Sequence, residues 1–266
     1  MAMRGPMRVW MTYPMTVIDT VFKALAPAIP DRAIAGHHAD LVFPNIHGIH
    51  PAEGKLFIVG IGPLGGGWGA KKNKDGVSVT VCINDGDTHN SPSEQLEAKY
   101  PVLVERYSIR EDSSGAGRTR GGLGAEMVVQ ALSPFSLTTR IDRMHCKPWG
   151  LEGGGEAAGN SVGIRRSGKW EIDLPNAKVF NVRLSRGDAY MMQSGGGGGF
   201  GDPMGRDPEL VAEDVHEGYV SAAVALNVYR VVLTAGGEVD VDATQARRRG
   251  KAPVRAEEEA FEIIPG

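Results

Sequence analysis

The sequence is poor in cysteine and in aromatic residues, and no stretch of it is apolar for long enough to cross a membrane. Its two cysteines, Cys82 and Cys146, are too few for a disulfide framework and lack zinc-finger spacing. The formal net charge of -3 gives no electrostatic reason to expect nucleic acid or an anionic membrane as a partner. The first residues also lack the apolar core of a signal peptide, so we expect a cytoplasmic protein.

Glycine, by contrast, is abundant, because the 266 residues include 37 glycines and 16 prolines. The glycines follow no Gly-X-Y period, which excludes collagen, and the apolar segments between them argue against disorder. Short apolar runs separated by glycine-rich turns predict an α+β, mainly β fold with a few helices. We expect one domain over residues 1–242 and a charged tail over residues 243–266, where a basic block precedes an acidic one.

Local patterns predict the positions of the helices and strands. In the first helix, over residues 15–28, Val17, Val21, Phe22 and Leu25 recur at helical spacing. The other helices are expected where capping residues precede apolar periodicity, over residues 93–100, from Asp207 onward, and over residues 219–227. Strands are expected where apolar or β-branched runs lie between turn residues, over 55–61, 77–84, 101–110, 124–132, 136–142, 161–166, 178–184, 188–193, 230–234 and 238–241.

Four of the seven histidines lie within residues 37–50, close to a carboxylate. Imidazole and carboxylate side chains suit a divalent transition metal, so His37, His38, Asp40 and His47 are candidate ligands. Their spacing matches no helical metal-binding motif, and the alternative is a polar loop without a metal.

Three glycine-rich or polar segments are expected to come together on one side of the domain. They are Gly62–Trp68, Asn84–Glu94 and Gly195–Asp202, and their glycines indicate backbone approaches that a side chain would block. The polar and aromatic residues of this candidate surface are Trp68, Asp87, Asn90, Glu94, Arg118 and Asp202. No phosphate-binding G-x-x-x-x-G-K-[ST] motif occurs, so we expect no ATP site in this chain.

Several motifs follow one another in a characteristic order along most of the chain. They are Gly65–Ala70, Asn84–Asp87 with Asn90–Pro92, Gly115–Arg118 with Arg120–Gly124, Pro148–Leu151, and Gly198–Pro203 with Arg206–Glu209. This series resembles the hydantoinase B / oxoprolinase family, which includes the large subunits of acetone and acetophenone carboxylases. The resemblance is to the C-terminal half of those subunits, and the segments Met11–Asp31 and His37–Asp40 lean towards the carboxylase branch.

The resemblance implies an ATP-dependent enzyme built from two types of subunit. A hydantoinase A-type partner would hold ATP and phosphorylate the amide or ketone oxygen of the substrate. The B-type subunit would then hydrolyse a lactam or hydantoin ring, or carboxylate a ketone. The family's divalent metal site belongs to the N-terminal half, which has no counterpart here, so no cofactor is assigned to this chain.

Two functions are compatible with these observations. The chain is either part of an ATP-dependent hydantoinase/5-oxoprolinase-type amidohydrolase or ketone carboxylase, or a non-catalytic interaction subunit or truncated remnant of such an enzyme. In the first case its partners would be a hydantoinase A-type subunit, an N-terminal hydantoinase B half and a small-molecule substrate. No residue set in the sequence distinguishes hydantoin, 5-oxoproline, a lactam or a ketone as that substrate.

Overall fold

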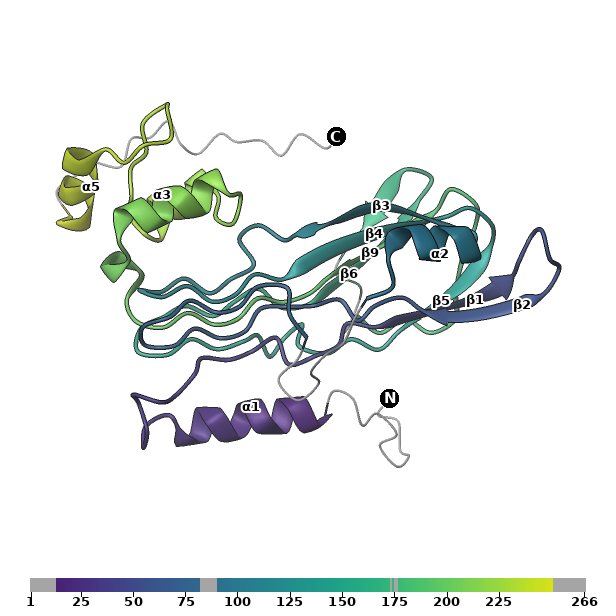
Figure 1. The fold of residues 1–266 in the computed structure, drawn as a ribbon, viewed down its shortest axis with the longest axis horizontal. Coiled ribbons are helices and arrows are strands. Elements are labelled where there is room, and N and C mark those ends of the chain that lie inside the picture. Colours follow the sequence, from purple (N-terminus) through teal and green to yellow (C-terminus); the bar gives the residue numbers. More distant parts are fainter. Residues whose placement is uncertain (1–12, 82–89, 173, 175–176, 251–266) are drawn as a thin grey trace. The chain divides into compact units, whose positions relative to one another are not determined.

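The computed structural model describes residues 13–81, 90–172, 174 and 177–250 (Figure 1). The chain divides into two compact units, the first ending at Arg206 and the second beginning at Asp207. The sequence suggested one domain through residue 242 instead. The boundary falls directly before the N-cap of a helix, because the Asp207 carboxylate accepts a hydrogen bond from the Glu209 backbone N–H at 3.1 Å.

Two antiparallel sheets form the larger part of the first unit, which confirms the α+β, mainly β prediction. The first sheet has four strands in the order β2 (Leu56–Gly60), β1 (Pro44–Ile49), β5 (Phe135–Thr139) and β8 (Val182–Leu184). The second has five strands in the order β3 (Val102–Ile109), β4 (Ala125–Ala131), β9 (Ala189–Gln193), β6 (Ser161–Arg166) and β7 (Lys169–Glu171).

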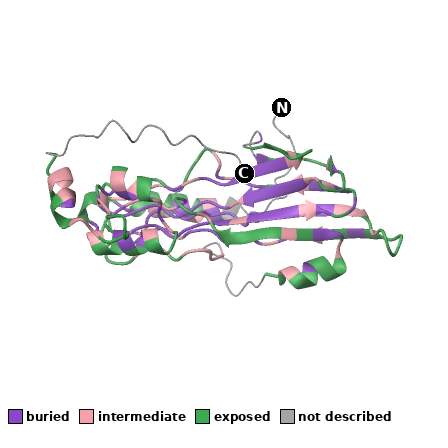
Figure 2. Ribbon diagram, turned by 90° about the horizontal axis from the view of Figure 1, so that it is seen from above, coloured by how far each residue is buried: buried purple, intermediate pink, exposed green. Residues whose placement is uncertain are grey.

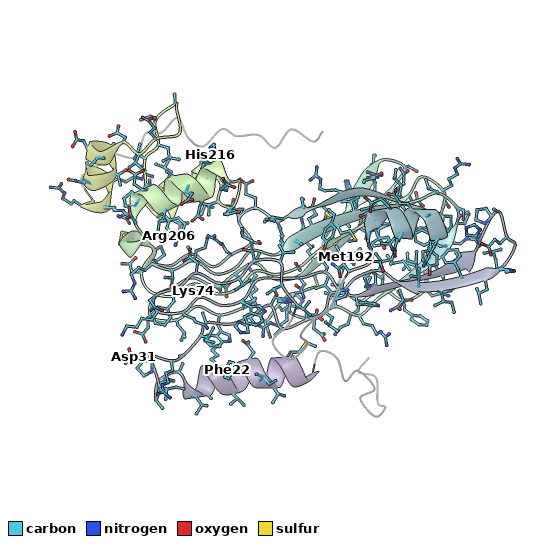
Figure 3. The ribbon with its side chains drawn as sticks, viewed as in Figure 1. Phe22, Asp31, Lys74, Met192, Arg206 and His216 are labelled. Atoms are coloured by element: carbon cyan, nitrogen blue, oxygen red, sulfur yellow. The ribbon has the colours of Figure 1, made fainter. Side chains whose placement is uncertain are left out.

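The two sheets share one buried apolar core, and the central strands are the most deeply buried (Figure 2). In β1 and β5 buried residues alternate with more exposed ones, as expected for strands with one face on a core. Ile46 and Leu137 face the core from the first sheet, and Val129 and Met192 from the second. Met192 is labelled in Figure 3. Helix α2 (Ser93–Lys99) adds Leu96 to the same core.

A bundle of extended glycine-rich segments continues from the sheets (Figure 1). Successive residues of Gly195–Phe200 form backbone hydrogen bonds with different segments, through Gly67, Ala158, Gly122, Gly36, Gly155 and Thr119 in turn. The backbone of a β-strand forms hydrogen bonds with two neighbouring strands, one on each side. A polyproline II-like chain has three residues per turn and no internal hydrogen bonds, so its backbone groups bond to the chains that surround it. Gly195–Phe200 is therefore the central segment of the bundle and not a strand of either sheet.

The bundle needs glycine because its backbones approach one another too closely for a Cβ atom. A Cβ at Gly197 would collide with the Trp68 carbonyl, and one at Gly121 would collide with the Gly197 carbonyl. Gly62–Trp68 and Gly195–Asp202 do come together, as predicted, since Gly67 N–H donates to the Gly195 carbonyl at 3.0 Å. Glycine abundance in this protein thus reflects close backbone packing more than turns.

Most of the expected elements are present, but three of the expected strands do not form regular strands in the described residues. All expected strands outside residues 77–84, 230–234 and 238–241 contain an observed strand. Residues 77–81 belong to the bundle, where Val79 bonds to Leu123 and Thr80 to Gly66, so no regular ladder forms; the rest of that segment lies outside the described residues. Between 230 and 241 only Leu233 and Val239 form a bridge.

The second unit is helical in its described part. It contains α3 (Pro208–His216), α4 (Ala222–Asn227) and α5 (Val241–Arg248), around the buried Val211, Ala225 and Tyr229. Helix α5 occupies a region that the sequence assigned partly to a strand and partly to the charged tail; Asp240 caps it by accepting from Ala243 N–H at 2.9 Å. Among the described residues, none of the helices combines the length and hydrophobicity of a membrane span.

Candidate functional site

A buried carboxylate joins helix α1 (Tyr13–Leu25) to the glycine bundle. Asp19 is 1% exposed, and its Oδ1 accepts a hydrogen bond from His37 N–H at 3.0 Å. Its Oδ2 accepts from Arg143 Nη1 and from Trp149 Nε1, both at 3.0 Å. Arg143 also donates to the His37 carbonyl at 2.8 Å, so the charge pair and its hydrogen bonds connect three chain segments. We call Asp19, His37, His38, Asp40 and Arg143 the buried polar cluster.

His37 is held as a neutral imidazole within this cluster. Its Nδ1 accepts a hydrogen bond from Gly69 N–H at 2.7 Å, and its ring stacks on Trp68 with 5.2 Å between centroids. Burial lowers the pKa of His37 to about 4; Asp19 opposes this change, and Arg143 and Lys71 reinforce it. Because Nδ1 accepts, the proton belongs on Nε2, which is buried without a partner among the described residues.

His38 is as deeply buried as His37, since each is 1% exposed. Burial lowers its pKa to about 3, with smaller contributions in the same direction from His37 and Arg143. The Thr80 backbone lies close enough to act weakly in the opposite direction, although neither ring nitrogen has a hydrogen bond of normal geometry within the described chain. A neutral imidazole in this position has no role in ion pairing.

Asp40 connects the histidine segment to the far side of the bundle. Its carboxylate accepts from Leu41 N–H at 2.7 Å, and from Asp142 N–H and Asn160 Nδ2 at 2.8 Å. Burial raises the pKa of Asp40 to about 6; the Asp142 charge adds to this increase, and the backbone hydrogen bonds oppose it. Asn160 in turn accepts from Gly195 N–H at 2.5 Å, so Asp40 is linked to the central segment Gly195–Phe200.

The four candidate metal ligands do not converge. His47 lies on β1, opposite Ile58 and Ser136, and the Asp40 oxygens already accept three N–H groups. In the part of the chain that the structure describes, no three His, Cys, Asp or Glu side chains could share a metal ion. The residues therefore do not fit a metal. With His37 and His38 1% exposed, the cluster positions the chain and does not contact a substrate in this structure.

The candidate surface is only partly assembled. Arg118 and Asp202 are exposed neighbours, since Arg118 N–H donates to the Gly201 carbonyl at 3.2 Å, but Asp202 caps the 3-10 turn Pro203–Gly205. Trp68 stacks on His37 instead of facing them. Exposed Asn90 and Glu94 belong to another region: Asn90 Nδ2 donates to Tyr107 Oη on β3 at 2.6 Å, and Glu94 lies in the first turn of α2. Asp87 lies outside the described residues.

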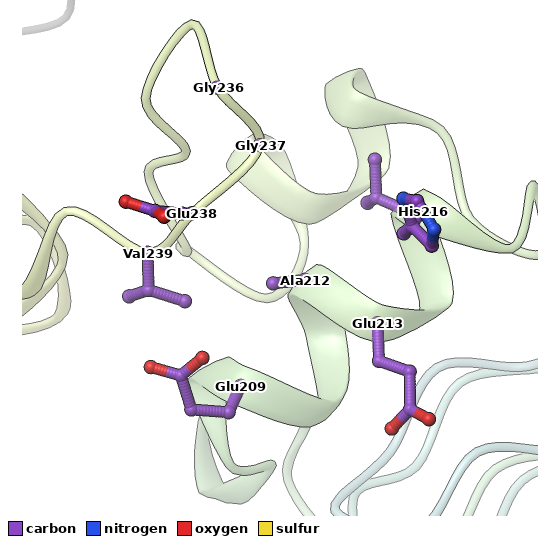
Figure 4. Close-up of a pocket in the computed structure, with 9 residues that line it drawn as sticks. Glu209, Ala212, Glu213, His216, Gly236, Gly237, Glu238 and Val239 are labelled. Carbon is purple, nitrogen blue, oxygen red and sulfur yellow. The ribbon is translucent and has the colours of Figure 1, made fainter.

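A separate hollow of about 650 Å³ lies in the second unit, between α3 and the loop Gly236–Val239 (Figure 4). Three exposed carboxylates line it, those of Glu209, Glu213 and Glu238, together with the exposed His216. Exposed carboxylates of this kind are ordinary surface groups, and nothing in the hollow arranges them as an acid–base pair.

Sequence reasoning missed the residues that hold the buried polar cluster together: Asp19, Arg143, Trp149 and Asn160. One signal was available, because Asp19 is the sole acidic residue of α1 and stands among apolar neighbours. A lone carboxylate within an apolar helix requires a partner when it is buried. The partner itself was not visible, since Arg143 is 124 residues away along the chain.

The sequence of the first unit matches a known protein family. The family model described as Hydantoinase B/oxoprolinase matches residues 6–203, and the chain belongs to this family. A relative is the putative D-/L-hydantoinase B-type subunit of Pseudomonas sp. (strain NS671), which is 30% identical over 233 residues, covering 88% of this chain and 38% of that protein.

Two solved structures share the fold. The ATP-dependent caprolactamase of Pseudomonas jessenii has a TM-score of 0.74 at 28% identity, over 85% of this chain and 40% of that chain. The nucleotide-free structure of acetone carboxylase has a TM-score of 0.72 at 23% identity, over 85% of this chain and 34% of that chain. This chain therefore spans well under half the length of the relatives that it matches.

Proposed function

We propose that this chain forms part of a hydantoinase B-type subunit in an ATP-dependent amidohydrolase or ketone carboxylase. The observation that carries the proposal is the family match over residues 6–203, which contain both sheets, the glycine bundle and the buried polar cluster. One relative is itself a B-type subunit of a hydantoinase, and the solved caprolactamase that shares the fold is ATP-dependent. This supports a working partnership with a hydantoinase A-type subunit.

In the proposed division of labour, the partner binds ATP and phosphorylates the amide or ketone oxygen of the substrate. Phosphorylation converts a poorly reactive group into one with a leaving group, which the B-type subunit then hydrolyses or carboxylates. This chain supplies a rigid scaffold, because its buried charges and histidines are used to hold segments together. Its candidate ligands do not fit a metal, so the role proposed for this chain includes no metal binding. We propose the cytoplasm as the location of such a complex, because ATP is available there.

The non-catalytic alternative has one observation in its favour. Three strongly shifted titratable groups, His37, His38 and Asp40, are enclosed and cannot reach a substrate in this structure. Perturbed pKa values mark catalytic sites only when the groups also face a cleft. Under this alternative the chain would stabilise or regulate the complex without contributing to turnover.

Reconstitution of the complex tests the proposal. The chain is co-purified with the hydantoinase A-type and B-type polypeptides of its own genome. ADP release is then measured with hydantoin, 5-oxoproline, caprolactam, or acetone plus bicarbonate. We expect substrate-stimulated ADP release that disappears when this chain is omitted. Turnover that is unchanged by the omission would exclude a catalytic contribution and establish the non-catalytic alternative.

A further inference from the structure

The outward face of α1 carries an aliphatic stripe without a charged residue. Val17, Val21 and Leu25 are 42%, 47% and 46% exposed, and Ile29 beyond the helix is 44% exposed. A spacing of four residues places them along one side of the helix. Exposed helix faces in soluble proteins normally carry polar and charged residues. We call Val17, Val21, Leu25 and Ile29 the α1 stripe.

The α1 stripe is not the face that attaches the helix to its own unit. Met15, Asp19 and Ala26 are buried, and Asp19 provides the hydrogen bonds to the buried polar cluster. The second charged residue of the helix, Lys23, places its Nζ 5.7 Å from the centroid of the Trp149 ring. Both charges of α1 are thus directed away from the stripe. The stripe is therefore aliphatic although it is exposed, which is unusual for the outward side of a surface helix.

A small hollow adjoins the end of the stripe. It has a volume of about 70 Å³, and Leu25 and Ile29 of the stripe line it together with Phe22, Arg32, Ala33 and Ile34. Its lining is aliphatic and aromatic except for Arg32, and Phe22 marks its position in Figure 3. The hollow has room for one aliphatic side chain of an incoming segment.

We propose that the α1 stripe docks an uncharged, aliphatic segment from the remainder of the hydantoinase B-type subunit. Chain length favours this occupant, because the shared fold makes up 40% and 34% of the two solved relatives and the rest of those chains must pack against something. Permanent contacts are more apolar than transient ones, and the stripe carries no charge that would set partner choice by complementarity. The proposal rests on the proposed function.

Site-specific photo-crosslinking tests this docking. Benzoylphenylalanine is introduced in place of Val21 in the source organism, and cross-linked peptides are identified by mass spectrometry. We expect peptides of a hydantoinase B-type sequence that lies outside the region matched here. Benzoylphenylalanine in place of Val228, a valine of the second unit that is 42% exposed, is the control and should capture none of them. Cross-links to a second copy of this chain, to lipid or to an unrelated protein would overturn the proposal.

A charge placed on the stripe provides the second measurement. Val21→Glu should weaken association with the B-type polypeptide by about tenfold or more, because an unpaired carboxylate would be buried at the contact. Its melting temperature should stay that of the wild type, since Val21 is exposed, and Val228→Glu should associate normally. If the cross-links reach the B-type sequence but the reconstituted complex shows no turnover, the proposed function is wrong and the docking site stands. If turnover requires this chain but Val21→Glu still associates normally, the docking site is wrong and the proposed function stands.

Discussion

Replacing His38 by glutamine should make the protein less sensitive to acid. In the unfolded chain an ordinary histidine has a pKa of about 6.5, whereas burial lowers the pKa of His38 to about 3. Between these values the unfolded state binds a proton that the folded state rejects, so the stability of the fold decreases as the pH falls below about 6.5. The His38 contribution is complete above that pH and is lost progressively on acidification.

The size of this loss in folding free energy follows from the pH range over which only the unfolded state binds the proton. From about pH 7 to about pH 5 the unfavourable proton uptake amounts to about 2 kcal/mol for His38, at roughly 1.4 kcal/mol per pKa unit. His37 adds a similar loss, with its pKa at about 4. Asp40 acts in the opposite direction by about 1 kcal/mol, because its raised pKa of about 6 stabilises the folded state as the pH falls. The contributions of His37 and Asp40 persist in the His38→Gln variant, so they cancel when the variant is compared with the wild type.

Urea unfolding followed by tryptophan fluorescence measures the difference, since Trp68 and Trp149 both contact the buried polar cluster. His38→Gln should lose about 2 kcal/mol less than the wild type between about pH 7 and about pH 5. His145→Gln, at an exposed histidine, is the matched control and should behave like the wild type. Equal losses in the wild type and in His38→Gln would refute the burial of a neutral His38.

Two further predictions concern the bundle and the charge pair. Gly197→Ala should destabilise the fold by about 3 kcal/mol or more, because its Cβ would collide with backbone, whereas Gly155→Ala, with neighbours at 3.5 Å, should be nearly neutral. Asp19→Asn should cost about 3–5 kcal/mol by leaving Arg143 buried and unpaired, while exposed Asp31→Asn should cost under about 1 kcal/mol. Urea unfolding measures all four; equal effects within either pair would contradict the reasoning.

Elements with strong local signals could be predicted from the sequence. Residues 161–166 are a strand and Asp207-Pro208 begins a helix, because apolar runs and capping groups act over a few residues. Helix α5 was missed because it is strongly polar and lies where a charged tail was expected. The apolar, β-branched run at residues 77–84 predicts a strand, but in its described part, residues 77–81, the hydrogen-bond partners are irregular glycine-rich segments.

The candidate site was predicted less well than the fold. The sequence identified Gly62–Trp68 and Gly195–Asp202 as segments that approach closely, because only glycine tolerates such contact. It also singled out His37, His38 and Asp40, either as candidate metal ligands or as residues of a polar loop without a metal. Their burial, and the bonds from Asp19 and Asn160, depend on chain segments that are remote in sequence.

The sequence by itself therefore determined the family, the fold class and most elements, since ordered motifs and local periodicity carry that information. Only the tertiary structure decided which side of each element is covered. The spacing of Val17, Val21 and Leu25 predicts a helix, yet these residues face outward, because Asp19 finds its partners at Arg143 and Trp149 on the other side. Periodicity defines a helical stripe; the position of distant partners decides what that stripe contacts.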